Sequence, residues 1–318
     1  MNKTYLGVDV GSISTNVVLL CGDRVIHSSY IRTSGNPARS VKEGLIEVKS
    51  KFGEIEIAGV GTTGSARKLI GELIGADIVK NEITAHAMAS TFYCPNVSTI
   101  IEIGGQDSKL IILKNGTVVD FCMNSVCAAG TGSFLDSQAN RLRIPIEEFG
   151  GISLNSKDGV NIAGRCTVFA ESDMIHKQQI GHKIEDILYG LCKSLVRNYL
   201  NNLSRGRELY EPIMFQGGVS ENKGIIRAFE ESLGKKLIIP EHNKVMGAIG
   251  AALLAQKNPA AQTKFRGFDI NEQTFTKTFV CKDCPNVCEV HESYVNGEIS
   301  SRWNDRCGKW QAMLVEVK

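Results

Sequence analysis

The chain has 318 residues, of which 42% are hydrophobic and 22% are charged, as in ordinary soluble globular proteins. This length is enough for two or three domains with cores of their own. The net charge of +2 argues against nucleic acid or an acidic membrane surface as a partner.

The first residues run directly into an apolar strand, without a charged and then apolar signal pattern. No apolar run in the sequence reaches the length that spans a bilayer. We therefore expect a cytoplasmic protein that does not contact a membrane. Its 10 cysteines then point to metal or redox chemistry rather than to disulfides.

The N-terminal part predicts a β-hairpin followed by further strands and helices. Residues 4–10 alternate into a glycine turn at Gly11, and Asn16–Leu20 is the expected returning strand. The next elements are expected in this order: a strand at 24–32, a helix at 38–52, a strand at 55–60, and helices at 66–74 and 82–92.

The same pattern starts again in the middle of the chain. Asp9–Leu20 aligns without a gap with Glu102–Leu113, 93 residues further on. In each copy an apolar strand, an acid, a glycine turn and a second apolar strand follow one another, and a third strand comes next. We infer two domains of one type, each led by a hairpin tip of small and polar residues. Two such tips facing each other would clamp phosphates with backbone N–H groups and hold a metal with acids.

The second half of the chain adds a third glycine turn. The apolar strand at 212–215 ends in Gln216-Gly217-Gly218, and glycines there allow a close approach to a flat base or a phosphate. A strand at 237–240 and a small-residue helix at 245–255 follow. Together with the two hairpin tips, this turn indicates a nucleotide site.

Two cysteines, Cys127 and Cys166, are each expected where a loop turns into a helix. A thiolate there faces unpaired N–H groups and the positive end of the helix dipole, which favours an anionic cluster. Neither has a CxxC partner, so one subunit offers two ligands, whereas a cubane cluster takes four thiolates. A symmetric dimer would supply two of each. Two buried structural cysteines are the alternative that position alone leaves open.

The composition changes after 258–262, where a domain boundary is expected, and the tail from Phe265 is polar, aromatic and rich in cysteine. It contains four cysteines, the last of them 19 residues after the third: Cys281, Cys284, Cys288 and Cys307. So many cysteines in a short segment predict a bound metal. Their spacing is not that of two paired CxxC knuckles, which leaves zinc and an iron–sulfur cluster both open.

These residues resemble the activator ATPases of 2-hydroxyacyl-CoA dehydratases. That family, of the BadF/BadG/BcrA/BcrD type, includes the ATPase subunits of benzoyl-CoA reductase and the reductases of double-cubane cluster proteins. The resemblance covers about residues 4 to 255, and its most specific motifs begin at Cys127 and Cys166. The matching stretches are Leu6–Ser12, Gly61–Gly64, Asn81–Ala87, Ile103–Lys109, Cys127–Gly132, Cys166–Ser172, Gly217–Val219 and Gly247–Ala252.

The resemblance implies an α/β protein of the actin-like ATPase fold, the fold of acetate and sugar kinases, Hsp70 and actin. Its two ribonuclease-H-like lobes would be followed by a small Cys-rich metal-binding segment. It also implies a homodimer in which one four-iron four-sulfur cluster bridges the subunits through Cys127 and Cys166. ATP hydrolysis would drive a low-potential electron, taken from reduced ferredoxin or flavodoxin, into a partner iron–sulfur enzyme. The Cys-rich tail departs from the short dehydratase activators, so that partner could instead be a double-cubane protein.

The repeat and the resemblance give each candidate residue an expected role. Asp9 would order the magnesium ion or its water, and Gln106 and Asp107 would orient the attacking water or the metal. Asp107 could instead only cap its hairpin. Lys109 would reach a phosphate of ATP or ADP, or else be a solvated lysine at a strand edge. His86 is expected to be a hydrogen-bonded helix histidine rather than a ligand. The remaining nucleotide-binding residues are expected to be Gly11, Ser12, Gly104, Gly105, Gly217 and Gly218.

The expected domains are a first lobe at 1–93, a second lobe at 94–258 and a Cys-rich metal-binding domain at 263–318, with the helix at 245–256 packing back on the first lobe. The predicted function is an electron-transferring ATPase. The alternative is a small-molecule kinase of the same fold, which would need a substrate pocket and a base that the sequence does not mark. A third interpretation is a nucleotide-operated binding module without electron transfer.

Overall fold

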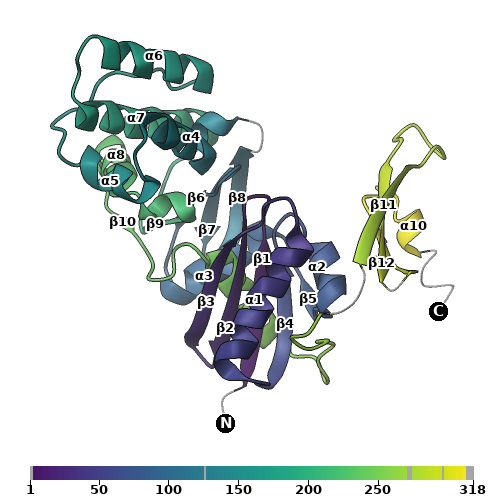
Figure 1. Cartoon of the computed structure of the whole chain (residues 1–318). Helices are drawn as coiled ribbons and strands as arrows, with labels where there is room; N and C mark the ends of the chain where they lie inside the picture. Colours follow the sequence, from purple (N-terminus) through teal and green to yellow (C-terminus); the bar gives the residue numbers. More distant parts are fainter. Residues whose placement is uncertain (1–2, 125–126, 271–273, 296, 313–318) are drawn as a thin grey trace. The chain divides into compact units, whose positions relative to one another are not determined.

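The computed structural model describes residues 3–124, 127–270, 274–295 and 297–312. The chain divides into two units. The first unit contains residues 1–11, 15–80 and 251–318, and the second contains residues 12–14 and 81–250. Each unit is an α/β structure with its own five-stranded sheet (Figure 1).

The sheet of the first unit has the order β3-β2-β1-β4-β5. β1 and β2 form the expected antiparallel hairpin, and β4 runs parallel to β1. The elements are β1 (Thr4–Val10), β2 (Ser14–Cys21), β3 (Arg24–Arg32), α1 (Pro37–Phe52), β4 (Ile57–Thr63), α2 (Arg67–Ile74) and β5 (Ile78–Val79). Leu6, Val17, Leu45 and Ile70 are fully buried and bring strands and helices into one core.

Residues 263–270 also belong to the first unit. Asp77 accepts hydrogen bonds from the Thr263 hydroxyl at 2.7 Å and from the Lys264 N–H at 2.8 Å. Phe268 and Ile270 are buried in the same core as β1 and α1. Residues 263–270 therefore complete this unit, although their composition resembles that of the tail.

The sheet of the second unit has the order β10-β9-β6-β7-β8. β6 and β7 form an antiparallel hairpin, β8 pairs with β7, and β9 runs parallel to β6, so the strand order repeats that of the first unit. The strands are β6 (Thr99–Ile103), β7 (Ser108–Lys114), β8 (Thr117–Asn124), β9 (Ile213–Gln216) and β10 (Leu237–Ile238). The internal repeat predicted from the sequence is confirmed.

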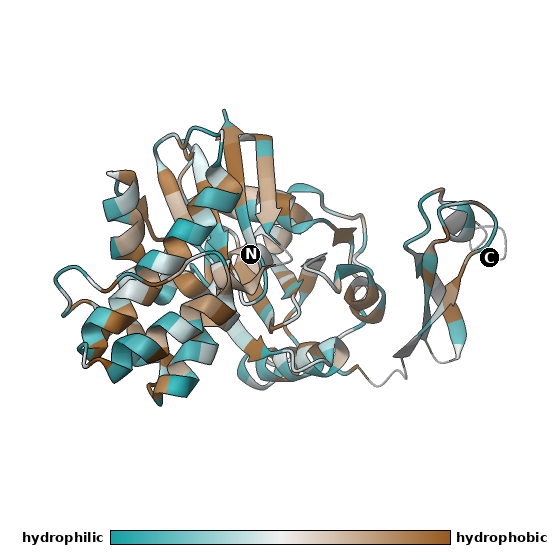
Figure 2. Ribbon diagram, turned by 90° about the horizontal axis from the view of Figure 1, so that it is seen from above, coloured by the Kyte–Doolittle hydropathy of each residue, from teal (hydrophilic) through white to brown (hydrophobic). Residues whose placement is uncertain are grey.

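The second unit also contains helices, and their ribbons carry both hydrophilic and hydrophobic residues (Figure 2). They are α3 (Glu82–Tyr93), α4 (Gly132–Leu142), α5 (Ile146–Ser153), α6 (Thr167–Gln179), α7 (Ile184–Tyr199) and α8 (Lys223–Leu233), with short helical turns η1 (Ala128–Gly130), η2 (Leu200–Ser204) and η3 (Gly218–Glu221). α7 is the most deeply buried of them, and its Cys192 lies in the core of this unit.

α9 (Met246–Lys257) is the small-residue helix predicted from the sequence, and the division between the units falls within it. A Cβ on Gly250 would lie 1.9 Å from the Ala85 carbonyl oxygen of α3. In the first unit, a Cβ on Gly61 of β4 would lie 2.0 Å from the Ala251 carbonyl oxygen. Both glycines are therefore required by the close approach of this helix to its neighbours.

The Cys-rich tail forms a three-stranded antiparallel sheet. Its elements are β11 (Thr274–Val280), β12 (Glu289–Val295), β13 (Glu298–Trp303) and the short helix α10 (Lys309–Ala312). The Phe279 ring packs edge-on against Trp310, with 4.8 Å between ring centroids. Within the described ranges, none of the helices combines the length and apolarity needed to cross a bilayer.

Candidate nucleotide and cluster site

Threonine hydroxyl groups hold the backbone at the hairpin tip of the first unit. Asp9, next to the last residue of β1, lies opposite Asn16 of β2, and Gly11 follows the strand at the turn. The Thr33 hydroxyl donates to the Gly11 carbonyl oxygen at 2.9 Å, and Thr15 lies within 3.0 Å of Thr33. These contacts fix the backbone of the tip while Asp9 stays half-buried.

The hairpin tip of the second unit presents the residues expected to act on the phosphates. The Gly104 N–H donates to the Asp107 carbonyl oxygen at 3.0 Å, which closes the turn. Gln106 is exposed at its apex, and Asp107 is half-buried. A Cβ on Gly105 would lie 2.7 Å from the Ile13 side chain, so this glycine leaves no room for any other residue.

Lys109 is the best-buried charged side chain of this hairpin, with 2% of its side chain exposed. Its ammonium lies 2.8 Å from Asp107, 2.9 Å from Glu102 and 2.9 Å from Glu82. Its interpretation as a solvated lysine is therefore wrong. Its contact with a phosphate remains a prediction, since in this structure its partners are three carboxylates.

These charges shift one another's proton affinity. Burial raises the pKa of Glu102 above its usual value, although the Lys109 ammonium works in the opposite direction. Burial also acts to lower the pKa of Lys109, but Glu102, Glu82 and Asp107 outweigh it and hold that pKa well above its usual value. Lys109 is therefore charged throughout the physiological range.

Two hydrogen bonds fix the Gln216 side chain, just before the glycine turn that follows β9. The Gln216 amide donates to Nδ1 of His86 at 3.0 Å, and the Ser90 hydroxyl donates to the Gln216 amide oxygen at 3.1 Å. Burial, followed by the nearby Lys109 ammonium, lowers the pKa of His86 to about 3, so the ring is neutral. His86 is thus a satisfied helix histidine, as the sequence predicts. Gly217 follows with a φ of +91°, which favours glycine.

The tip turn of the second unit is hydrogen-bonded to the start of α4. The Gly132 N–H donates to the Gly104 carbonyl oxygen and the Ser133 N–H to the Gly105 carbonyl oxygen, both at 2.9 Å. The Ser133 hydroxyl also donates to the Gly105 carbonyl oxygen. Two N–H groups that a helix N-terminus leaves unpaired are therefore used to hold the turn.

Cys127 and Cys166 occupy the helix starts that the sequence predicts. Cys127 is the residue before η1 and Cys166 the residue before α6, and both are half-buried. The Cys127 thiol donates to the Arg165 carbonyl oxygen at 3.8 Å, which places it next to the residue that precedes Cys166. Asn124 holds Cys127 from both sides, accepting from its N–H at 3.0 Å and donating to its carbonyl oxygen at 2.8 Å.

α7 fastens the two cysteine segments to one rigid element. The Asn198 amide donates to the Gly164 carbonyl oxygen, two residues before Cys166. The same amide oxygen would lie 2.8 Å from a Cβ on Gly130, three residues after Cys127. Ser194 adds a hydrogen bond to the Ala163 carbonyl oxygen at 2.6 Å.

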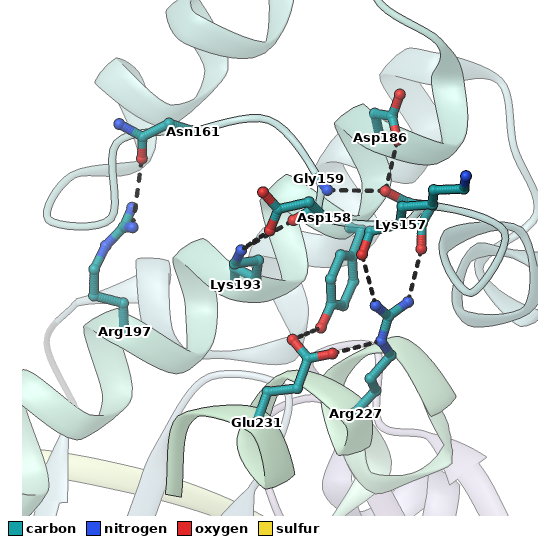
Figure 3. A network of polar contacts seen from close by, with 11 residues as sticks. Lys157, Asp158, Gly159, Asn161, Asp186, Lys193, Arg197, Arg227 and Glu231 are labelled. Atoms are coloured by element: carbon teal, nitrogen blue, oxygen red, sulfur yellow. Dashed lines mark hydrogen bonds and ion pairs between the residues drawn. The ribbon is translucent and has the colours of Figure 1, made fainter. Parts of the chain in front are cut away.

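The loop that leads to Cys166 is held further upstream by a polar network (Figure 3). Arg227 of α8 donates to the Ser156 carbonyl oxygen at 2.8 Å and to that of Lys157 at 3.0 Å. It also pairs with Glu231 at 2.7 Å, and Lys193 of α7 pairs with Asp158 at 2.9 Å. The loop is thus fixed between α7 and α8 although it has no regular structure of its own.

No group of three or more His, Cys, Asp or Glu side chains in the described part of the chain is arranged to hold a metal ion. Cys127 and Cys166 are two possible thiolate ligands, so a four-thiolate cluster at this place would need two further ligands from a second subunit. In the tail, the Cys281 N–H donates to the Cys288 carbonyl oxygen at 2.8 Å, so two of its four cysteines face each other at the two ends of the connection between β11 and β12. The tail metal site remains a prediction from spacing.

Sequence reasoning gave no role to Glu82, Glu102, Ser133 or Asn198. Glu102 could have been found, because an antiparallel hairpin closed at Gly104-Gly105 places it directly opposite Lys109. Ser133 could have been suspected from its place in the first helical turn after the Cys127 motif. Glu82 and Asn198 reach the site from α3 and α7. Nothing at their positions in the sequence indicates that these helices pack next to the site.

The comparisons with known proteins agree with this geometry. The model of the BadF/BadG/BcrA/BcrD ATPase family matches residues 6–255. The chain is 37% identical over 265 residues to the (R)-2-hydroxyglutaryl-CoA dehydratase activating ATPase of Acidaminococcus fermentans, covering 82% of this chain and 100% of that protein. It is 36% identical over 253 residues to the 2-hydroxyisocaproyl-CoA dehydratase activator of Clostridioides difficile, covering 79% of this chain and 94% of that protein.

A solved structure gives the same result for the fold. The activator of the 2-hydroxyisocaproyl-CoA dehydratase from Clostridium difficile with bound ADPNP matches with a TM-score of 0.75 at 35% identity, covering 81% of this chain and 95% of that one. The chain therefore belongs to the BadF/BadG/BcrA/BcrD ATPase family and has its actin-like ATPase fold.

Proposed function

We propose that this ATPase couples ATP hydrolysis to the transfer of a low-potential electron from a subunit-bridging four-iron four-sulfur cluster to a partner iron–sulfur enzyme. The observation that carries the proposal is the placement of Cys127 and Cys166 at neighbouring helix starts. They lie in the same unit as the tip turn at Gly104-Gly105, which is hydrogen-bonded to the helix that follows Cys127. Nucleotide and cluster chemistry would thus share one connected set of hydrogen bonds.

The two cysteines fit such a cluster in a homodimer. Each lies before a helical turn, where unpaired N–H groups stabilise an anionic cluster, and each is accessible enough to meet a second copy. Val168 and Phe169, just after Cys166, are each 66% exposed, which is typical of apolar side chains that a partner covers. Two chains would supply four thiolates. When bound, the cluster would supply a one-electron couple of low potential.

The nucleotide would be ATP or ADP with a magnesium ion. Asp9 would order that ion or its water, and Gln106 and Asp107 would orient the attacking water. Backbone N–H groups of the glycine turns would bind the phosphates, and the turn after β9 would border the adenosine. The residues in these turns are Gly11, Ser12, Gly104, Gly105, Gly217 and Gly218.

The partner is inferred from the relatives, which are named as activators of 2-hydroxyacyl-CoA dehydratases. We propose an acceptor enzyme of the dehydratase or double-cubane type and a reduced ferredoxin or flavodoxin as donor. The tail would hold a second metal, zinc or an iron–sulfur cluster, through its four cysteines.

The test is anaerobic purification with iron and sulfide analysis and a visible spectrum. Cys127→Ser and Cys166→Ser should each remove the iron of the bridging cluster and weaken the dimer, whereas Cys94→Ser, at another half-buried cysteine, should remove none. A brown wild-type protein that stays equally rich in iron in both variants would refute the assignment. A colourless protein would instead favour a kinase or a nucleotide-operated binding module.

A further inference from the structure

The ion cluster around Lys109 joins the parts of the second unit that are expected to bind nucleotide. Glu102 comes from the end of β6, Asp107 from the tip turn and Glu82 from the first turn of α3. The Lys109 ammonium lies within 2.9 Å of a carboxylate oxygen of each. One buried cation thus connects a strand, a turn and a helix.

The exposed fractions of these side chains show which of them lie deeper in the protein. The Lys109 and Glu102 side chains are 2% and 6% exposed, whereas Asp107 is 31% exposed. Lys109 therefore lies beneath Asp107 and supports it from the interior. A ligand at the tip would meet the Asp107 carboxylate before it met the ammonium.

The Glu102 carboxylate also packs against the two glycine turns at Gly104 and Gly217. One oxygen accepts from Lys109. The other would lie 3.4 Å from a Cβ on Gly104 and 2.9 Å from a Cβ on Gly217. The Glu102–Lys109 ion pair therefore packs against Gly104 and Gly217 and also contacts Asp107. Its loss would disturb all three residues together.

The first hairpin has different residues at the matching positions. Asp9 and Asn16 occupy the positions that match Glu102 and Lys109, and they face each other across β1 and β2 in the same register. A carboxylate therefore faces an amide in the first hairpin, whereas Glu102 faces the Lys109 ammonium in the second. The two copies of the repeat thus differ in charge at this pair of positions.

We propose that Lys109 is a positioning residue for ATP hydrolysis, anchored by Glu102, which holds the Asp107 carboxylate in the orientation that acts on the attacking water. The inference rests on the role proposed above for Asp107. It assigns Lys109 a place behind the reacting groups rather than on a phosphate, and it gives Glu102 a role in the site.

A purely structural ion pair would behave differently from a positioning pair. Removing one partner of a buried pair destabilises a protein because the other charge is left unpaired, but replacing both by apolar side chains of similar volume is often neutral. Glu82 and Asp107 also lose the ammonium in both variants, but their side chains are 21% and 31% exposed and so stay partly solvated. If Lys109 and Glu102 only support the fold, the double replacement should restore both stability and activity. If they position Asp107, the double replacement should restore stability alone.

The experiment compares Lys109→Met, the double variant Glu102→Leu with Lys109→Met, Asp107→Asn and wild type. The control Lys114→Met replaces an exposed lysine of the same strand. Thermal unfolding, kcat and KM are measured for hydrolysis of magnesium ATP by the full-length chain under anaerobic conditions. Lys109→Met should unfold at a lower temperature and lose kcat by about 100-fold, a loss typical of a misplaced catalytic group. The double variant should regain most of its thermal stability with kcat still about 100-fold low and KM within about threefold.

Recovery of kcat to within about threefold of wild type in the double variant would overturn the proposal, as would an unchanged kcat in Lys109→Met. If Lys109→Met does not fold, Lys109→Gln keeps an uncharged amide NH2 donor group in the cluster and should lose about tenfold in kcat. Full activity in Asp107→Asn would instead remove the catalytic role proposed for Asp107, so the two failures can be told apart.

Discussion

His86 shows how one buried side chain links the two parts of the candidate site. It is on the same helix as Glu82, one turn further on, and both side chains point at the sheet of the second unit. Glu82 contacts Lys109 of β7, while His86 accepts from Gln216 at the end of β9. α3 is therefore attached to the hairpin tip of the second unit and to the glycine turn after β9 by adjacent polar contacts.

The neutral state of His86 predicts how stability depends on pH. The unfolded chain protonates this histidine below about pH 6.5, whereas the folded chain keeps it neutral down to about pH 3. Between these values the unfolded state binds one more proton, so the free energy of unfolding falls as the pH falls. At pH 5 the loss from this group should be about 2 kcal/mol relative to pH 7.

Urea unfolding at pH 7 and pH 5 measures this effect. His86→Gln, which cannot be protonated, should reduce the difference between the two pH values by about 2 kcal/mol. His182→Gln, at an exposed position of the same unit, should leave it unchanged. An equal pH dependence in wild type and His86→Gln would show that the folded protein tolerates a charged His86.

At the scale of the elements, the sequence predicted most of the fold because its signals are local. The third strand of the first unit occupies Arg24–Arg32 as expected, and α3 starts at Glu82 behind the cap Asn81. The gap-free repeat predicted two sheets of one strand order, and the helix starts at Cys127 and Cys166 followed from loop and helix patterns.

What the sequence did not reveal depends on packing between distant segments. Asn198 lies between the two cysteine segments only because α7 crosses both of them. The burial of Lys109 follows from the arrival of Glu82 on α3, which no spacing within the hairpin announces. Composition was likewise silent on Phe268, which resembles the polar and aromatic tail yet enters the core of the first unit.

This packing predicts where the tail can be removed. A chain that ends at Ile270 keeps Phe268 and Ile270 in the core of the first unit, whereas a chain that ends at Gln262 loses both. Each side chain should stabilise the fold by about 1.5–3 kcal/mol, so the shorter chain should unfold at a clearly lower temperature. Thermal unfolding of both chains tests this, with full-length protein as the control.

Metal analysis of the same proteins tests the tail site. Both truncated chains should bind ATP and keep the bridging cluster while losing one metal site per chain, because all four tail cysteines are gone. Equal stability of the two truncations would show that residues 263–270 are not needed for the first unit. An unchanged metal content would argue against a metal site in the tail.

At the scale of the whole molecule, the proposed coupling requires that the bound nucleotide, ATP or ADP, changes the environment of the cluster. The tip turn that is expected to contact the γ-phosphate is hydrogen-bonded through Gly104 and Gly105 to the first turn of α4. Only the helical turn η1 and Thr131 separate that helix from Cys127, and Asn198 connects the Cys127 segment to the one before Cys166. Loss of the γ-phosphate should change the contacts at the tip and thereby the environment of both cysteines.

A ligand shifts such an equilibrium only by its different affinity for the two states, so ATP and ADP should have measurably different effects. The rate at which an iron chelator removes the cluster reports its accessibility. Asp107→Ala should reduce hydrolysis and weaken this nucleotide dependence together, while the iron content stays unchanged. The chain that ends at Ile270 is the suitable protein, because it excludes any iron bound by the tail.

The most direct test of the central claim is therefore the rate of cluster chelation under anaerobic conditions with saturating magnesium ATP and with saturating ADP. We predict faster chelation with magnesium ATP than with ADP. Equal rates in the two states, with binding of both nucleotides confirmed, would contradict the coupling of ATP hydrolysis to the cluster.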